Sequence, residues 1–455
     1  MATDPKRWLD LLVPRMQARW RAVEKFEQYY DGNHPLAFAT SKYREQFAAM
    51  LHTLNDNWMA LVVDAVEERL HVEGFRFGTD TAGDRDAWTI WQRNELDADS
   101  ELAHSTAITT GVCPVMVWAD GDGLAQITVE HPSQVFVAYE PGSRRRRVAA
   151  VKVWIDEWSN KTFANLYLPD SITKWSGPAP SAGSFLGQWT ERSATLPNPL
   201  GVVPIVELVN RPKLLGTGRS EIAEVLSTQD QINKLVCDMM VAAEFSAFKQ
   251  RWATGIEMPL DPETGEEVEN LKAAQDRLWH TANETAKFGE FGQTDLGIYV
   301  KAIENRVQSL ASRTRTPPHY LLGQAGSFPS GESLKATETG LIAKVRSRQR
   351  HFGERWEEIE RLAFAVEGST RDDTVTAETI WDDPESRTES EHIDSLVKKL
   401  ALGVPLPQLW EDAGYTPTQI ERFRSMLVEY AAIQALATVT TAVPQDVPPL
   451  VHVGG

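Results

Sequence analysis

Two long runs of helical periodicity, each ended by a segment that cannot continue a helix, constrain this fold more than any other feature. In the first run the apolar residues share one helical stripe: Ile222, Val225, Leu226, Ile232, Val236, Met239 and Ala243. The second run predicts a helix of more than thirty residues, marked by Leu334, Leu341, Val345, Phe352, Trp356, Ile359, Ala363 and Val366. Such stripes are longer than a small compact domain can easily cover.

The segments between these runs are of two kinds. Residues 251–293 are polar and rich in turn residues, and a helical pattern resumes near Thr294. The stretch Arg315–Glu338 then carries three prolines and three glycines. Glycine permits backbone conformations that other residues avoid and proline stiffens its flanks, so this stretch is predicted to be a loop that bends between helices.

The rest of the chain predicts an α+β fold of two to four domains in 455 residues. Residues 5–70 have the pattern of amphipathic helices broken by the turn "YYDGNHPL". From Cys113 to about Trp175 the period changes to two, which predicts an antiparallel meander. Residues 198–212 predict one short buried strand.

Composition narrows the range of partners. The net charge of −18 disfavours nucleic acid or anionic membrane as a partner of the average surface, although a local basic strip remains possible. Cys113 and Cys237 are too few for a disulfide framework and are expected to be core thiols. The N-terminus has no signal-peptide pattern and no run of 18 apolar residues occurs, so a cytosolic chain without a membrane span is expected.

No motif predicts catalysis, a metal or a cofactor. "GTGRSEIAE" lacks the Lys-Ser/Thr of a phosphate-binding loop, and a helix start with Ser220 as the N-cap and Glu221 and Glu224 in the first turn is favoured. "ADGDGLAQ" lacks the later ligands of a calcium loop and predicts a hairpin turn. The ten histidines form no metal-ligand or catalytic pattern.

The run Arg144–Arg147 is the one dense basic cluster. Successive residues of a strand or turn point in two directions, so the four side chains cannot form one flat strip for phosphates. A solvated hairpin edge that blocks sheet-to-sheet pairing is the favoured interpretation. Contact with nucleic acid or with a neighbouring subunit is the alternative.

Several stretches, taken in order, resemble the portal proteins of tailed bacteriophages, in the branch typical of long-tailed siphophages. The matching segments are "YYDGNHPL", "NPLGVVPIVELVNRP", "GRSEIAEVLSTQDQINKLVCDMMVAAEF", "KQRWATGI" and "RTPPHYLLG". Each is weak alone, but their order and spacing cover residues 25 to 435.

The resemblance implies a portal fold. Its parts would be an α/β wing (1–217), a stem helix (218–250), a clip (251–293), a second stem helix (294–314), a tunnel loop (315–331), a long wing helix (332–370) and a helical crown (371–437). Residues 438–455 are rich in Pro and Val without a period and are expected to be disordered. It also implies a ring, dodecameric in the virion, at one capsid vertex, with double-stranded DNA passing along its axis.

Two groups of residues are the predicted sites. In the tunnel loop, Gln324, Ser327 and Ser330 would face DNA with weak polar contacts, since no Lys or Arg occurs between Thr316 and Leu334. Phe328 would either tuck against the wing helix or meet the neighbouring loop. In the clip, four carboxylates would dock the packaging motor and later a connector protein: Asp261, Glu263, Glu266 and Glu267.

Three functions are therefore compared. A passive conduit and assembly platform would work with a terminase motor, a head-completion or adaptor protein, and major capsid and scaffolding proteins. A nucleotide-driven enzyme that moves DNA would need a phosphate loop and a magnesium carboxylate, and the sequence predicts neither. A DNA-binding regulator is disfavoured by the acidic balance and the lack of a reading helix.

Overall fold

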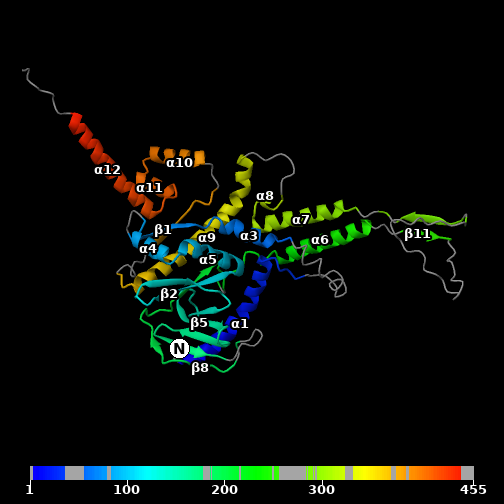
Figure 1. Ribbon diagram of the computed structural model, residues 1–455, viewed down its shortest axis with the longest axis horizontal. Helices are drawn as coiled ribbons and strands as arrows, with labels where there is room; N and C mark the ends of the chain where they lie inside the picture. Colours follow the sequence, from blue (N-terminus) through cyan, green and yellow to red (C-terminus); the bar gives the residue numbers. More distant parts are fainter. Residues whose placement is uncertain are drawn as a thin grey trace, which may run out of the picture. The chain divides into compact units, whose positions relative to one another are not determined.

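The computed structural model places most of the chain in two compact units (Figure 1). The first unit comprises Met1–Phe26, Val63–Glu221 and Glu338–Gly455, and the second comprises Glu27–Val62 and Ile222–Thr337. The residues that the structure describes are 4–35, 56–78, 83–177, 185, 187–214, 217–247, 251–255, 283, 285–290, 292, 295–322, 331–369, 376–385 and 389–441.

The first unit combines helices with three antiparallel sheets, so the predicted α+β class is confirmed. Its helices are α4 (Arg85–Arg93), α5 (Leu96–Thr110), α10 (Glu389–Ala401), α11 (Leu406–Asp412) and α12 (Pro417–Thr441), with most of α1 (Pro5–Tyr30) and α9 (Gly331–Val366). Its longer strands are β1 (Val72–Phe77), β2 (Val112–Ala119), β3 (Ala125–Val129), β4 (Val135–Tyr139), β5 (Arg147–Asp156), β6 (Lys161–Tyr167), β7 (Ser171–Ser176), β10 (Ile205–Val209) and β13 (Ala377–Trp381).

The predicted meander is antiparallel throughout but belongs to two sheets. One sheet has the order β4-β5-β6-β7-β8, with β8 (Thr190–Glu191) at its end and β9 (Leu196–Pro197) also paired to β7. The other has the order β10-β2-β3, so the buried strand predicted within residues 198–212 pairs with β2. The turn between β2 and β3 is the predicted hairpin, in which Asp120 Oδ1 accepts the backbone N–H groups of Asp122 and Leu124.

The core beside the β4–β8 sheet follows from the helical spacing of α1. Leu9, Leu12, Val13 and Met16 recur at intervals of three, one and three residues, which places them on one face. They pack with inward-facing residues of β5 and β6 that alternate along each strand: Val151, Val153, Ala164 and Leu166.

The long helix predicted after the Gly/Pro loop is confirmed as α9, of 36 residues. Its predicted stripe is buried from Leu341 to Ala363, where Leu341, Val345, Phe352, Trp356, Ile359 and Ala363 are all 0% exposed, and Val366 is half-buried. Trp356 donates its indole N–H to His104 Nε2 of α5 (2.9 Å), and burial lowers the pKa of that imidazole to about 3. The histidine is a neutral core residue.

The expectation that a helix starts at Ser220 is wrong. The helix α6 spans Leu226–Ala247, and Glu221 lies before it, 4% exposed, between Lys344 Nζ (3.3 Å) and Arg348 Nη2 (2.6 Å) of α9. Two buried cations at these distances stabilise the carboxylate more than the dipole of a helix N-terminus would. The chain also passes close to another backbone segment just before Glu221, since a Cβ at Gly218 would lie 1.9 Å from Gly111 O.

Two further expectations for the C-terminal part need correction. The segment expected to be a helical crown (371–437) also contains β13, which pairs with β1 in register Phe75↔Thr379. Its partner lies some 300 residues away, and single-sequence periodicity gives no sign of such a pairing. The helix α12 also continues to Thr441, into the segment expected to be disordered; residues 442–455 lie outside those described.

The second unit holds a smaller set of elements. Those within it are α6, β11 (Arg251–Thr254), β12 (Lys287–Glu290), α7 (Gly297–Thr314) and the short helix α8 (Pro318–Leu321). The last turn of α1 and the start of α3 (Trp58–Glu67) also belong to it. Cys237 is buried in α6, and Cys113 is buried in β2, so both are core thiols as predicted.

Candidate functional site

Helices α6 and α7 form an antiparallel pair, drawn side by side in Figure 1. The guanidinium of Arg313, near the end of α7, donates to Glu224 O (2.6 Å) and to Thr228 Oγ1 (3.2 Å) at the start of α6. The end of α7 therefore lies against the start of α6. At the other end of the pair, β11 follows α6 and β12 precedes α7.

The "YYDGNHPL" segment is hydrogen-bonded to α6 through polar side chains. Tyr29 donates its hydroxyl to Asp230 Oδ1 (2.7 Å), and the amide of Asn233 contacts His34 Nδ1 (2.9 Å). Burial and the Asp230 carboxylate raise the pKa of the Tyr29 hydroxyl, which keeps it a proton donor. The Gly-Asn turn thus serves to return the chain onto the first turns of α6.

The apolar stripes of this helix pair are only partly covered within the second unit. In α6, Ile232 is 0% exposed, whereas Val236, Met239 and Ala243 of the predicted stripe are half-buried. In α7 the buried residues lie in the second half, from Val307 on, and Ile298 near its start is 66% exposed. The apolar residues of the pair are buried near α8 and exposed toward the β11–β12 hairpin.

The chain leaves α7 through a fixed turn. Arg315 adopts the left-handed conformation (φ 56°), and the hydroxyls of Thr314 and Thr316 lie 3.0 Å apart, both buried. Pro317 and Pro318 then set the start of α8. Of the predicted DNA-facing residues, Gln324, Ser327, Phe328 and Ser330 lie outside the described residues, so the orientation of these side chains stays a prediction.

The β11–β12 hairpin closes the other end of the pair. Trp252 lies over Gly289, where an added Cβ would be 2.5 Å from the indole, so a larger residue at this position would displace the ring. Trp252 and Phe288 are both partly exposed. The predicted docking carboxylates Asp261, Glu263, Glu266 and Glu267 lie outside the part of the chain that the structure describes.

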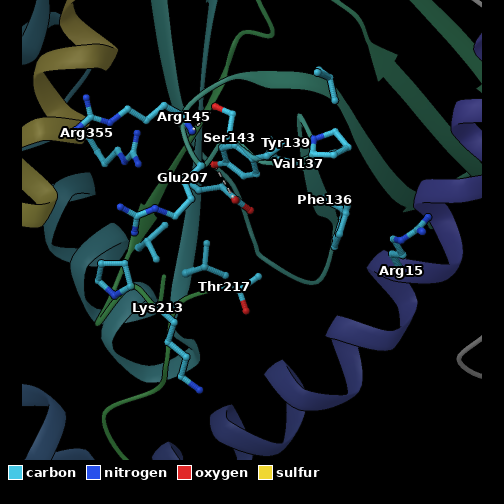
Figure 2. A pocket seen from close by; sticks show the side chains of 18 of the residues that line it. Arg15, Phe136, Val137, Tyr139, Ser143, Arg145, Glu207, Lys213, Thr217 and Arg355 are labelled. Carbon is cyan, nitrogen blue, oxygen red and sulfur yellow. Dashed lines mark hydrogen bonds between the residues drawn. The ribbon is translucent and has the colours of Figure 1, made fainter. Parts of the chain in front are cut away.

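A basic pocket of about 1330 Å³ lies wholly within the first unit (Figure 2). Helix α1 carries Arg15 on one side of it and helix α9 carries Arg355 on the other, with the β4–β5 turn between them. Its nine cationic side chains are Arg7, Arg15, Arg19, Arg144, Arg145, Lys213, Arg350, Arg355 and Arg361. Only Glu207, Glu354 and Glu358 oppose them, in a chain whose net charge is −18.

The carboxylates of the pocket are engaged by its own arginines. Glu207 accepts from Arg19 Nη1 (2.8 Å) and from the Tyr139 hydroxyl (3.1 Å). Glu358 holds Arg147 and Arg355, and although burial alone raises its pKa, these two guanidiniums lower it overall. Among the described residues, Arg144, Arg145, Lys213 and Arg350 have no ion-pair partner. The pocket therefore keeps a positive surplus.

The run Arg144–Arg147 divides between two environments. Arg147, the first residue of β5, has a side chain 7% exposed and bound to Glu358, so the solvated interpretation is wrong for it. Arg144 and Arg145 are exposed in the β4–β5 turn and line the pocket, and Arg146 pairs with Glu140 (3.4 Å). The sheet's lateral edge is β4, not this turn. The pocket itself was not predicted; the arginines of α1 at positions 7, 15 and 19 were its available signal.

The remaining chemistry is sparse. The described residues contain no group of three or more His, Cys, Asp or Glu that could hold a metal ion. No described helix is long and apolar enough to cross a membrane. The Gly218–Glu221 segment offers no anion cradle, because the N–H groups of Arg219 and Glu221 already donate to Asn210 O and Ile108 O.

Comparison with known proteins shows the family of the chain. The family described as "Phage portal protein, SPP1 Gp6-like" matches residues 10–422, which is most of the chain. The chain therefore belongs to this family of phage portal proteins, and the resemblance noted in its sequence is confirmed.

Two relatives are similar over almost the whole length. The portal protein of Mycobacterium phage L5 is 30% identical over 97% of this chain and 92% of its own, and that of Mycobacterium phage D29 is 29% identical over the same shares. A chain of the virion of a native gene transfer agent particle is 10% identical and covers 79% of this chain and 88% of its own. Its TM-score is 0.42, too low to support an argument.

Proposed function

We propose that this portal protein forms a ring at one capsid vertex and serves as a conduit for double-stranded DNA and as a docking platform. Terminase would dock to it during packaging and a head-completion or adaptor protein afterwards, with major capsid and scaffolding proteins around it. The chain would be a structural component, made in the host cytoplasm and retained in the virion, and not an enzyme.

The observation that carries the proposal is the antiparallel pair α6–α7. Its inner contacts are polar and specific, as between Arg313 and Thr228, yet Ile298 and Val300 of α7 are exposed. An apolar stripe that a helix pair leaves uncovered is typical of a surface that a partner covers, whereas single exposed apolar residues are common. In a ring, the same pair of the next copy supplies that surface, and the helices become the channel wall.

The remaining parts of the proposal follow from the family layout. Residues 251–293 would form the clip, with Asp261, Glu263, Glu266 and Glu267 as the motor-docking carboxylates. The tunnel loop (315–331) would place Gln324, Ser327 and Ser330 toward DNA. An acidic chain suits a conduit, because every phosphate neutralised by a cation adds salt-dependent affinity and slows sliding.

Negative-stain electron microscopy and light scattering of the full chain test the assembly. Rings with a central hole are expected at capsid-like salt and concentration, with twelve copies when assembled with capsid and scaffolding proteins. Monomers alone under these conditions would contradict the proposal. ATP hydrolysis with DNA present, abolished by a point mutation in this chain, would favour the enzyme instead.

Docking and passage have separate tests. Reversing the four clip carboxylates should weaken terminase binding, most at low salt, while rings still form. Replacing Gly323 and Gly326 by proline should leave rings intact and reduce the DNA that particles package or retain. Normal filling by the second variant would make the loop a simple connector.

A further inference from the structure

The turn between β5 and β6 presents one tryptophan wholly to solvent. Trp158 is 100% exposed, although the turn around it is ordered. Asp156 Oδ1 accepts the N–H of Trp158 (3.1 Å) and its Oδ2 accepts the Ser159 hydroxyl (2.6 Å), while Asn160 closes the turn at φ 50°. We call Asp156–Asn160 the Trp158 turn. Its hydrogen bonds fix the backbone that carries the indole, while the ring itself packs against nothing in the chain.

An exposed indole of this kind has the properties of a binding anchor. Tryptophan is enriched among the residues that dominate interface energies, because a rigid ring buries a large area at little entropic cost. Two carboxylates, Asp156 and Glu157, precede it directly. The complement of this turn is therefore a concave surface with an apolar floor and cationic walls.

The basic pocket is such a surface. Trp8, Leu11 and Phe136 contribute apolar lining, and its volume of about 1330 Å³ is ample for an indole. Arg15, Arg144 and Arg145 lie around the lining and can meet carboxylates or the face of an aromatic ring. A DNA duplex fits less well, because its phosphates would meet the cations of the pocket but offer nothing to the apolar lining.

The pocket and the turn cannot meet within one chain. Strand β5 runs from Arg147 beside the pocket to Asp156 at the turn, and ten extended residues span about 30 Å. Nor can two pockets face each other, since both carry the same surplus of positive charge. Two complementary patches at opposite ends of one strand define a head-to-tail contact, the type that closes into rings.

We propose that the Trp158 turn of one copy of this chain docks into the basic pocket of the next copy. The indole contacts the apolar lining between α1 and the β4–β5 turn, and Glu157 pairs with the arginines that line the same pocket. This inference rests on the proposed ring, to which it assigns one contact between neighbours.

The first test removes the anchor. Trp158→Ala deletes a side chain that touches nothing in its own chain, so the thermal unfolding of the monomer should not change. The ring fraction should fall at least tenfold at equal concentration, measured by size-exclusion chromatography with light scattering. Leu102→Ala, at another exposed apolar residue of the same unit, is the matched control and should form rings normally.

The second test reverses charge on one helix. Arg15→Glu changes a pocket residue of α1, and Arg21→Glu changes an exposed residue of the same helix that does not line the pocket. Only Arg15→Glu should lower the ring fraction. Its effect should shrink as salt rises, because the contact it disturbs is partly ionic.

The third test traps the contact. Glu157→Cys combined with Arg145→Cys should give a ladder of disulfide-linked copies on a denaturing gel after mild oxidation, since both native cysteines are buried. Each single variant should stop at dimers or monomers.

If wild-type rings form but Trp158→Ala rings match them and the double-cysteine chain gives no ladder, the contact is refuted while the ring stands. If Trp158→Ala instead loses only capsid attachment, the turn binds a capsid protein, which also refutes it. If wild-type rings never form, the proposed function fails first.

Discussion

Helix α9 in the first unit and the pair α6–α7 in the second were predicted from the same kind of apolar stripe, but they reach different states. The stripe of α9 is buried at every predicted position from Leu341 to Ala363. That of α6 is buried only in its first half, and α7 leaves Ile298 66% exposed. Periodicity alone does not distinguish a stripe covered by its own chain from one that awaits a partner.

The units also treat charge differently. The first buries the carboxylate of Glu221 with the cations of Lys344 and Arg348, whereas in the second the Asp230 carboxylate is paired with the neutral hydroxyl of Tyr29. Buried ions are costly unless they are paired, and Glu221 has two cationic partners. The stripe of α9 is covered within its own chain, whereas α6 and α7 leave apolar residues exposed. Four substitutions test that contrast.

The largest effect is expected for Trp356→Ala in α9. The indole is 0% exposed and bonded to His104, so its removal leaves a cavity and an unpaired imidazole nitrogen. The free energy of unfolding should fall by about 3–5 kcal/mol in urea titrations. Trp356→Phe, which keeps most of the volume, should cost clearly less. Equal losses for both would mean that the hydrogen bond outweighs the packing.

Glu221→Gln should come next, since it leaves Lys344 and Arg348 buried without a counter-charge; a loss of about 3 kcal/mol is expected. Burial raises the pKa of Glu221, but Lys344 and Arg348 outweigh it and hold the pKa at about 2. The folded pKa lies below the unfolded value of about 4.3, so the carboxylate stabilises above pH 4.3 and this contribution disappears as pH falls toward 2.

The pH dependence of unfolding gives the control for that pair. Between pH 5 and 2 the wild type should lose stability that Glu221→Gln has already lost, so the two curves converge. Asp394→Asn, at an exposed pair with Lys398, should follow the wild-type curve of stability against pH. Parallel curves for wild type and Glu221→Gln would show that the pair does not titrate in this range.

A smaller effect of opposite sign is expected at Glu360. This carboxyl is fully buried, has no hydrogen-bond partner among the described residues, and burial followed by Asp84 and Glu367 raises its pKa well above the usual value. The folded state therefore keeps a proton that the unfolded state releases, and stability falls as pH rises above about 4.3. Glu360→Gln cannot titrate, so it should be more stable than wild type at pH 8 and nearly equal at pH 4. A gain independent of pH would contradict this.

The smallest effect on stability is expected for Ile298→Ser in α7. Because the side chain is mostly exposed, the free energy of unfolding of the monomer should change by less than about 0.5 kcal/mol. Ring formation should nevertheless weaken if the neighbouring copy covers this residue. Ser309→Ala, on the same helix, serves as the control for both measurements. A large loss of monomer stability would show that α7 is covered within its own chain.

Much of the fold could be predicted because its signals are local. The 3.6-residue stripe of α9, the alternation through β5 and β6, and the Asp-Gly turn after β2 each depend on neighbours within a few residues. The order of five short motifs was enough to indicate the portal family, and that resemblance is confirmed. The predicted clip and tunnel-loop residues remain predictions, since they lie outside the described residues.

The sequence by itself determined the long helices, most strands and the family, because hydrogen bonds along a helix and alternation along a strand are set by nearby residues; it did not predict α4 and α5. Only the tertiary structure decided that Glu221 joins Lys344 and Arg348 in place of starting a helix, and that β13 pairs with β1. It also decided that arginines from α1, α9 and one turn surround a single pocket, with Trp158 at the far end of β5. These depend on residues up to 300 positions apart in the chain, whose attraction acts only after folding has brought them together.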